Sequence, residues 1–183
     1  MKAKGFTVFL TSLSGAGKST TANALLNRLV ESGRSVTLLD GDSVRKHLSR
    51  ELGFSREHRD LNIHRIGFVA AEITRHGGVC ICANIAPYDA ARREARAMVE
   101  AHGGFVLVHV ATPLSVCESR DSKGLYARAR AGLLREFTGV SDPYETPKDA
   151  EITIDTSTTS PNDAAGLIVH FLKVQGYLER TFQ

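Results

Sequence analysis

The stretch Ser12–Thr20 constrains this chain most, because its glycines, lysine and hydroxyl side chains are spaced as in a phosphate-binding loop. An apolar run rich in β-branched and aromatic side chains, residues 6–10, precedes it and predicts a buried strand. Residues 21–30 follow with Ala, Leu and Val at helical spacing. In such a strand–loop–helix unit, backbone N–H groups and the positive end of the helix dipole form a concave anion site. The sequence therefore predicts a nucleoside triphosphate site.

Lys18 and Ser19 are the residues of this P-loop that carry chemistry. Lys18 is expected to reach the β- and γ-phosphates, and the Ser19 hydroxyl to ligate Mg²⁺. The pattern G-x-x-x-x-G-K-[ST] has a glycine where this chain has Ser12, and a serine fits that turn only with a negative φ. The alternative is a Gly/Ser-rich turn with an incidental lysine. The predicted ATP-binding residues of the loop are Ser14, Gly15, Ala16, Gly17, Lys18, Ser19 and Thr20.

The length of 183 residues and the hydrophobic content of 42% fit one domain with a single sizeable core. No run of about 18 apolar residues occurs and the N-terminus lacks a signal-peptide pattern, so neither membrane insertion nor secretion is expected. Cys80, Cys82 and Cys117 are expected to be buried thiols in a reducing cytoplasm.

The net charge of +3 is modest, and the chain has no basic stripe interleaved with aromatic residues. Nucleic-acid binding requires a stronger basic surface than this, so no nucleic-acid partner is expected. Arg92, Arg93 and Arg96 are expected to lie on a solvated helix face.

Short apolar runs alternate with helical patterns along the rest of the chain. Strands are expected at residues 35–39, 79–85, 105–110 and 152–154, and helices at 43–50, 63–77, 89–101, from 112 onward and at 164–174. This alternation predicts an α/β fold of the P-loop NTPase type, with a parallel sheet of about five strands and helices on both faces. Residues 1–183 are expected to form a single P-loop kinase domain, with the basic segment 120–142 as its lid.

Ligands of such folds bind beyond the carboxyl ends of the strands. The P-loop, the turn Asp40–Asp42 and residues 86–88 all follow predicted strands, so we expect them to form one site. Two carboxylates beside a phosphate and Mg²⁺ site can orient metal-bound water and accept a proton from an attacking hydroxyl. The alternative for this turn is a pair of solvated acids.

Two polar and two aromatic side chains later in the chain are candidates for binding a nucleotide. Arg59 and Asn62 are three residues apart on one helix face, and their side chains suit a phosphate and a base or sugar edge. Phe54 and Phe137 stand in otherwise polar loops, where an aromatic ring can stack on a base. The alternatives are that Arg59 is solvated, that Asn62 is an ordinary helix residue, and that the two aromatic rings only anchor their loops.

The segment that starts at Arg120 is cationic and follows the predicted strand 105–110. Such a segment can fold over phosphates, exclude water and neutralise charge in the transition state. A solvated amphipathic helix is the alternative. The Lys-Gly-Leu-Tyr sequence at 123–126 favours the lid.

Together these blocks resemble the adenylylsulfate (APS) kinases, which phosphorylate the ribose 3′-hydroxyl of adenosine 5′-phosphosulfate to give 3′-phosphoadenylyl sulfate. The resemblance covers nearly the whole chain and keeps the order of the blocks. Besides the P-loop, the blocks are Leu39-Asp40-Gly41-Asp42-Ser43-Val44-Arg45, Leu52-Gly53-Phe54-Ser55, Arg59 with Asn62-Ile63, Ile85-Ala86-Pro87-Tyr88, Asp121-Ser122-Lys123-Gly124-Leu125-Tyr126, Phe137-Thr138-Gly139-Val140 and Pro143-Tyr144-Glu145.

The resemblance implies catalytic roles for Lys18, Asp40 and Asp42. Asp42 would be the base that approaches the 3′-hydroxyl, and Asp40 would lie near Mg²⁺, binding it directly or through water together with Ser19. Arg120 would lie over the ATP side. Phosphoryl transfer would be direct and in line.

The resemblance also implies a substrate site. Phe54 and Phe137 would sandwich the substrate adenine, and Lys123 would engage the anionic end from the lid. The substrate-binding residues implied are Asp42, Arg45, Phe54, Arg59, Asn62, Ile85, Lys123, Gly124, Leu125 and Phe137. A homodimer is the expected assembly, and a fusion or association with a sulfate adenylyltransferase is the expected partnership, because family members occur in such fusions.

This chain departs from the family pattern at four positions: Ser12 replaces Gly, Ser43 replaces Asn, His64 replaces Arg and Ala86 replaces Ser. None of these changes removes a residue that the chemistry requires. Two other functions stay open. One is a kinase of another small hydroxyl compound, such as gluconate or shikimate, for which an aromatic clamp is not needed. The other is a non-catalytic nucleotide-binding regulatory domain; the guanine motif Asn-Lys-x-Asp of a GTPase switch is absent from the sequence.

Overall fold

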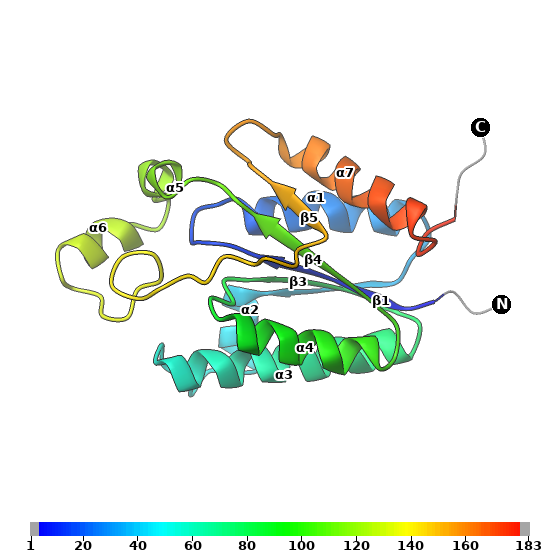
Figure 1. The fold of residues 1–183 in the computed structure, drawn as a ribbon, viewed down its shortest axis with the longest axis horizontal. Coiled ribbons are helices and arrows are strands. Elements are labelled where there is room, and N and C mark those ends of the chain that lie inside the picture. The colour runs from blue at the N-terminus through cyan, green and yellow to red at the C-terminus, as the bar shows by residue number, and fades with distance from the viewer. Residues whose placement is uncertain (1–3, 180–183) are drawn as a thin grey trace.

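The computed structural model describes residues 4–179 and shows a five-stranded parallel sheet between two helical layers (Figure 1). The strand order is β2-β3-β1-β4-β5. Because β1 is central and pairs with β3 on one side and β4 on the other, the loop after β1 lies where the winding of the chain reverses. The strands are β1 (Phe6–Thr11), β2 (Val36–Asp40), β3 (Val79–Asn84), β4 (Gly104–Val110) and β5 (Ile152–Ile154).

Two helices cover each face of the sheet (Figure 1). The helices α1 and α7 pack together on one face, and α3 and α4 pack together on the other. The short helices α2, α5 and α6 lie toward the carboxyl ends of the strands (Figure 1). The helices are α1 (Lys18–Glu31), α2 (Gly41–His47), α3 (Arg56–Arg75), α4 (Asp89–Glu100), α5 (Leu114–Arg120), α6 (Leu125–Arg130) and α7 (Pro161–Val174).

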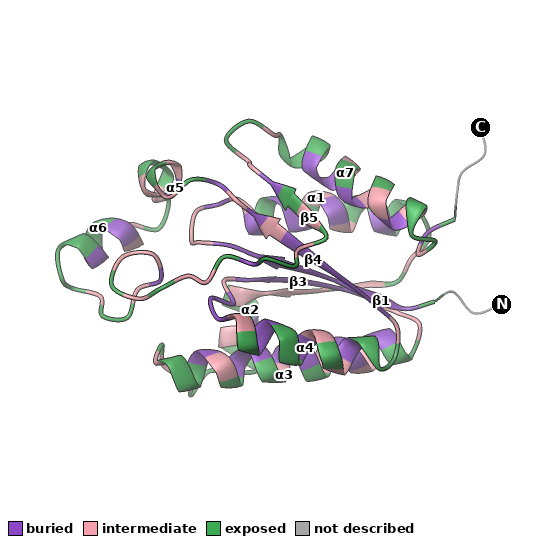
Figure 2. Ribbon diagram, in the orientation of Figure 1, coloured by how far each residue is buried: buried purple, intermediate pink, exposed green. Residues whose placement is uncertain are grey.

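The central strand β1 supplies side chains to two hydrophobic cores. Phe6, Val8 and Leu10 pack into the core beneath α1 and α7, whereas Phe9 packs into the core beneath α3 and α4. This alternation follows from the two-residue period of a strand. Because both faces are covered, every residue of β1 and β3 is buried (Figure 2).

The predicted α/β class, the parallel sheet and the helices on both faces are confirmed. Two helices begin earlier than their periodicity indicates, because polar side chains cap them. Asp40 Oδ1 accepts from the backbone N of Asp42, so α2 begins at Gly41, and Ser55 Oγ accepts from the N of His58, so α3 begins at Arg56. The segment 120–142, whose periodicity is weak, contains the short helix α6.

The expectation that Arg92 lies on a solvated face of α4 is wrong. Its side chain is 2% exposed, whereas that of Arg93 is 67% exposed. Arg92 points inward because backbone carbonyls meet its guanidinium group there, a contact that the periodicity of one helix does not reveal.

Cys80, Cys82 and Cys117 are buried free thiols, as expected. The Sγ atoms of Cys80 and Cys82 lie 3.7 Å apart on one face of β3. Within residues 4–179 no helix is both long enough and apolar enough to cross a membrane.

Candidate active site

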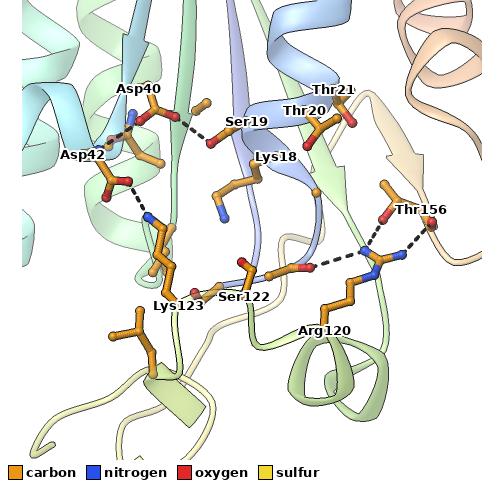
Figure 3. Close-up of a pocket in the computed structure, with 18 of the residues that line it drawn as sticks. Lys18, Ser19, Thr20, Thr21, Asp40, Asp42, Arg120, Ser122, Lys123 and Thr156 are labelled. Carbon is orange, nitrogen blue, oxygen red and sulfur yellow. Dashed lines mark hydrogen bonds and ion pairs between the residues drawn. The ribbon is translucent and has the colours of Figure 1, made fainter. Parts of the chain in front are cut away.

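Two neighbouring cavities open at the carboxyl edge of the sheet. The larger, of about 630 Å³, lies between the P-loop and the segment 120–125, and we call it the nucleotide cleft (Figure 3). The smaller, of about 130 Å³, lies between α2, α3 and the segment after β3, and we call it the acceptor pocket. The lining residues common to both cavities are Gly41, Asp42, Asn84 and Ile85. A group bound in one cavity therefore lies next to a group bound in the other.

The P-loop joins β1 to α1 through two glycines in the left-handed region, Gly15 with φ of 72° and Gly17 with φ of 92°. A Cβ at Gly15 would lie 3.0 Å from the carbonyl oxygen of Cys117, and one at Gly17 would lie 3.0 Å from Thr156 Oγ1. Glycine is therefore required at both positions by conformation and by space. The turn places the N-terminus of α1, which begins at Lys18, at the floor of the nucleotide cleft.

The side chain of Lys18 is held inside the P-loop by neutral oxygen atoms. Its Nζ donates to Leu13 O at 2.8 Å and to Ser12 Oγ at 3.0 Å. Burial lowers the pKa of Lys18 to about 8, against which the nearby Cys117, Asp40 and Asp42 act weakly. The positive charge is thus directed into the cleft without a carboxylate hydrogen-bonded to it.

Ser12 fits the P-loop without backbone strain. Within residues 4–179, the non-glycine residues in the left-handed region are Ala86 and Glu136, so Ser12 meets the condition stated from the sequence. Its hydroxyl is buried, donates to Leu13 O at 2.9 Å and accepts from Lys18. The serine therefore adds an acceptor for Lys18 that a glycine could not supply.

Oxygen atoms from the P-loop and from the end of β2 meet beside Lys18. Ser19 Oγ donates to Asp40 Oδ2 at 2.6 Å, while Asp40 Oδ1 caps α2 (Figure 3). A hydroxyl and a carboxylate are hard oxygen ligands of the kind that Mg²⁺ takes alongside phosphates and water. The donor set therefore fits this cation.

Arg120 lies over the P-loop, at the end of α5. Its guanidinium group donates to Gly15 O at 3.3 Å, to Thr156 Oγ1 at 2.9 Å and to Thr156 O at 2.9 Å (Figure 3). Thr112 Oγ1 and Thr156 Oγ1 both donate to Ala16 O, at 3.1 and 2.8 Å. The two threonines support the P-loop from behind, and motif spacing missed both. Thr112 follows β4 and Thr156 follows β5. The rule that ligands bind beyond the carboxyl ends of parallel strands therefore applies to these two strands as well.

The segment 121–126 closes the other side of the nucleotide cleft. Lys123 Nζ is hydrogen-bonded to Asp42 Oδ2 (Figure 3). The Tyr126 hydroxyl donates to Ser14 O at 2.9 Å. Gly124, with φ of 64°, provides the turn into α6, and Leu125 lines the cleft. The lid cation expected for an anionic ligand therefore pairs with the expected base.

Arg45, Arg59 and Asn62 line the acceptor pocket. Arg45 donates to Leu52 O at 3.0 Å and to Gly53 O at 2.8 Å, and its guanidinium lies 4.4 Å from the centre of the Phe54 ring. Asn62 Oδ1 is buried and has no hydrogen-bond partner within residues 4–179. Because a buried acceptor is costly without a partner, this atom is available to a ligand that donates a hydrogen bond.

Arg59 connects the two aromatic loops. Its Nε donates to Phe54 O at 2.8 Å, and its Nη2 donates to Glu136 O at 2.5 Å, directly before Phe137. The Phe54 ring is 57% exposed, whereas the Phe137 ring packs edge-on against Tyr126 with centroids 5.1 Å apart. Arg59 thus braces both loops through backbone contacts.

The chain is similar to known proteins over most of its length. Residues 4–155 match the family model described as adenylylsulphate kinase. The chain is 49% identical over 179 residues to an adenylyl-sulfate kinase of Synechococcus sp. strain JA-3-3Ab, covering 98% of this chain and 100% of that one. It is 53% identical over 178 residues to a sulfate adenylyltransferase of Phaeosphaeria nodorum, covering 96% of this chain. The chain spans 31% of the length of that longer relative.

Two solved structures share the fold. One is the Mycobacterium tuberculosis APS kinase in complex with AMPPNP and APS, with a TM-score of 0.89 and 38% identity over 93% of this chain and 98% of that one. The other is described as a hexameric APS kinase from Thiobacillus denitrificans, with a TM-score of 0.76 and 50% identity over 97% of this chain and 30% of that one.

Replacing Ser12 tests its contact with Lys18. Both Ser12→Ala and Ser12→Gly remove an acceptor from the lysine, so the pKa of Lys18 should fall further below its ordinary value. A Lys18 pKa of about 8 predicts an alkaline limb of kcat/KM for ATP near pH 8 in the wild type. We expect this limb to move down by about one pH unit in both variants, because a hydrogen bond to a charged group contributes roughly 1.5 kcal/mol, which is about one pKa unit. Improved ATP use by the glycine variant alone would instead indicate strain at Ser12.

Proposed function

The chain belongs to the adenylylsulphate kinase family, and we propose that it transfers the γ-phosphoryl group of ATP to the 3′-hydroxyl of APS. The products would be ADP and 3′-phosphoadenylyl sulfate. The observation that carries this proposal is the position of Asp42 on the wall shared by the nucleotide cleft and the acceptor pocket. A carboxylate there would face both a phosphoryl donor in the cleft and a hydroxyl acceptor in the pocket, as a general base in phosphoryl transfer requires.

Lys18 and Arg120 are the proposed cations on the ATP side. Phosphoryl transfer needs little covalent help from the protein, because its transition state is stabilised chiefly by positioning and by positive charge. Lys18 supplies a buried charge at the floor of the cleft, and backbone N–H groups of the P-loop would bind the phosphates. Arg120, braced by Thr156, would cover the nucleotide from above.

Ser19 and Asp40 would hold Mg²⁺ together with the phosphates of ATP. When bound, the cation would neutralise charge on the transferring phosphoryl group. The contact between Ser19 Oγ and Asp40 Oδ2 keeps both oxygens on the same side of the cleft. Asp40 also caps α2, so the same carboxylate positions the backbone that leads to Asp42.

The acceptor pocket would take the APS nucleoside. Phe54 and Phe137 are proposed to stack on its adenine, with Arg59 fixing the two loops that carry them. Asn62 Oδ1 would accept a hydrogen bond from the base. Arg45 and the segment of Ile85 complete the pocket, while Lys123, Gly124 and Leu125 would face the anionic end of APS from the lid.

Lys123 would leave Asp42 when the substrate binds. The phosphosulfate offers Lys123 a second anionic partner, which would free the carboxylate to accept the 3′-hydroxyl proton.

We also propose the association with a sulfate adenylyltransferase, since the curated relative of that name contains a segment like this chain. The homodimer and the cytoplasmic location stay predictions, and one solved relative is described as hexameric.

A coupled assay of ADP release tests the function directly. We expect turnover with APS and none above background with gluconate or shikimate. Lys18→Ala should reduce the rate strongly, because loss of one stabiliser of transition-state charge costs roughly 3–4 kcal/mol. Turnover with another hydroxyl acceptor but not with APS would identify a different kinase, and nucleotide binding without turnover would identify a regulatory domain.

The aromatic clamp is tested by Phe54→Ala and Phe137→Ala. Stacking of a base on an aromatic ring is worth about 1–3 kcal/mol, which corresponds to a roughly five- to hundredfold change in affinity. We expect each variant to weaken APS binding by that amount and ATP binding much less, as measured by isothermal titration. Equal losses for both nucleotides would show that the rings only stabilise the fold.

Direct transfer through a ternary complex is the expected kinetic mechanism. Ala86 stands where the family pattern has a serine, and a methyl side chain cannot carry a phosphoryl group. Initial-rate plots should therefore intersect, chiral γ-phosphate should be inverted, and Ala86→Ser should not raise the rate. A trapped phosphoenzyme, or retention of configuration, would contradict direct transfer and direct attention to Ser14 or Ser19.

A further inference from the structure

Ala86, in the segment that follows β3, is held in a conformation that an alanine rarely adopts. Its φ is 45°, in the left-handed region, although it carries a Cβ and is 2% exposed. Such conformations are unfavourable for L-residues and persist only where the surroundings impose them. Ile85, Ala86 and Pro87 line the acceptor pocket, so the shape of that pocket depends on this strained turn.

A buried arginine on α4 meets the strained turn. Arg92 Nη1 donates to Ala86 O at 2.7 Å, and Nη2 donates to Glu145 O at 2.7 Å. Its nearest carboxylate is Asp89, with Oδ1 at 3.4 Å. Since the side chain is 2% exposed, the guanidinium has given up water for these carbonyl oxygens. Both Nη atoms are thereby hydrogen-bonded, whereas the buried Nε has no partner within residues 4–179.

The same arginine ties the turn to a distant segment of the chain. The backbone N of Glu145 donates to Pro87 O at 2.8 Å, and Glu145 Oε2 accepts from the N of Asp89 at 2.6 Å. The Tyr88 hydroxyl donates to Asp142 Oδ2 at 2.6 Å. Residues 86–89 and 142–145 thus form one hydrogen-bonded unit with Arg92 at its centre.

The loop directly before Phe137 repeats this arrangement. Glu136, with φ of 53°, is the second non-glycine residue in the left-handed region within residues 4–179. Its carbonyl accepts from the buried Arg59, whose Nε also lies 3.8 Å from Asp142 Oδ2. Each of the two strained carbonyls next to the acceptor site is therefore held by a buried guanidinium, and both guanidinium groups reach the segment 142–145.

We propose that Arg92 is a positioning residue for the acceptor: it holds Ala86 in the left-handed conformation and thereby sets the wall formed by Ile85, Ala86 and Pro87. Arg92 does not line the acceptor pocket, so it acts through the turn. Without the donors of Arg92, the Ala86 carbonyl would keep only the longer contact from Thr11 Oγ1, at 3.3 Å, and Ala86 would relax toward negative φ and move the wall. The inference rests on the proposed function only in taking this pocket as the APS site.

Steady-state kinetics of Arg92→Met, which keeps the length of the side chain and removes its donors, test the proposal. We expect the KM for APS to rise by roughly tenfold or more, the effect of losing hydrogen bonds from a charged donor. The KM for ATP should change little. Arg93→Met is the matched control, because Arg93 lies on the same helix, is exposed and shares the partner Asp89 with Arg92 but not the carbonyls of Ala86 and Glu145. It should behave as the wild type.

A second substitution separates positioning from simple stabilisation. Glycine adopts left-handed φ without cost, so Ala86→Gly added to Arg92→Met should recover part of the lost APS affinity. If Arg92 only stabilised the fold, Arg92→Met would lower the apparent kcat in proportion to the folded fraction, the KM values for APS and ATP would stay unchanged, and Ala86→Gly would restore no APS affinity. The proposal would be overturned by an unchanged KM for APS in Arg92→Met, or by a raised KM for APS that Ala86→Gly does not lower.

Two controls keep the experiment decisive. If Arg92→Met does not fold, Arg92→Lys retains the cation but can reach fewer of the carbonyls; we expect the same selective rise in KM for APS, rescued by Ala86→Gly. Turnover of APS by the wild type is measured first. Its absence would refute the proposed function, whereas normal wild-type turnover with an insensitive Arg92 would refute only this inference.

Discussion

The parallel pairing of β1 with β3 and β4 is the constraint on which the rest of the structure depends. Because all strands run in the same direction, their carboxyl ends meet at one edge, and the loops after them must share that edge. The P-loop occupies the centre because β1 is the central strand. Asp40 arrives from β2 and Ile85 from the segment after β3, while Thr112 and Thr156 support the loop from β4 and β5.

Buried cations at this edge are held mainly by neutral oxygens. Lys18 donates to Ser12 Oγ and Leu13 O, Arg59 to two backbone carbonyls, and Arg92 to two others. Such partners satisfy most of the donors, although the buried Nε of Arg92 has no partner within residues 4–179. Neutral partners do not cancel the positive charge; Arg59 and Arg92 each also have one nearby carboxylate, at 3.8 and 3.4 Å. For Lys18 that charge is available to phosphates, and burial lowers its pKa to about 8, so the charge depends on pH in the range where the enzyme would work.

The parts of the site that lie on one short motif could be predicted from the sequence, because strand, loop and helix fix their own geometry. The P-loop and the pair Asp40 and Asp42 belong to this class. The placement of Arg120 over the P-loop does not, because its contact with Gly15 O joins residues 105 apart, and only the family resemblance implied it. Arg92 could not be predicted, because its burial depends on carbonyls 6 and 53 residues away in the chain. Likewise, the P-loop pattern indicated only that a serine at position 12 needs a negative φ, whereas the hydrogen bond from Lys18 to Ser12 Oγ is visible only in the folded structure.

The cations of this site differ in how readily they can change partners, because some are buried and Lys123 is exposed. Lys18, Arg59 and Arg92 are buried, and moving any of them would leave carbonyls and donors unpaired at high cost. Lys123 is different, because its side chain is 57% exposed and its partner Asp42 is 78% exposed. An exposed ion pair contributes little to stability, and water replaces each partner readily. Lys123 of the proposed lid and Asp42, the proposed base, can therefore separate when an anionic acceptor enters, while Arg59 and Arg92 keep the loops beside the acceptor pocket in place.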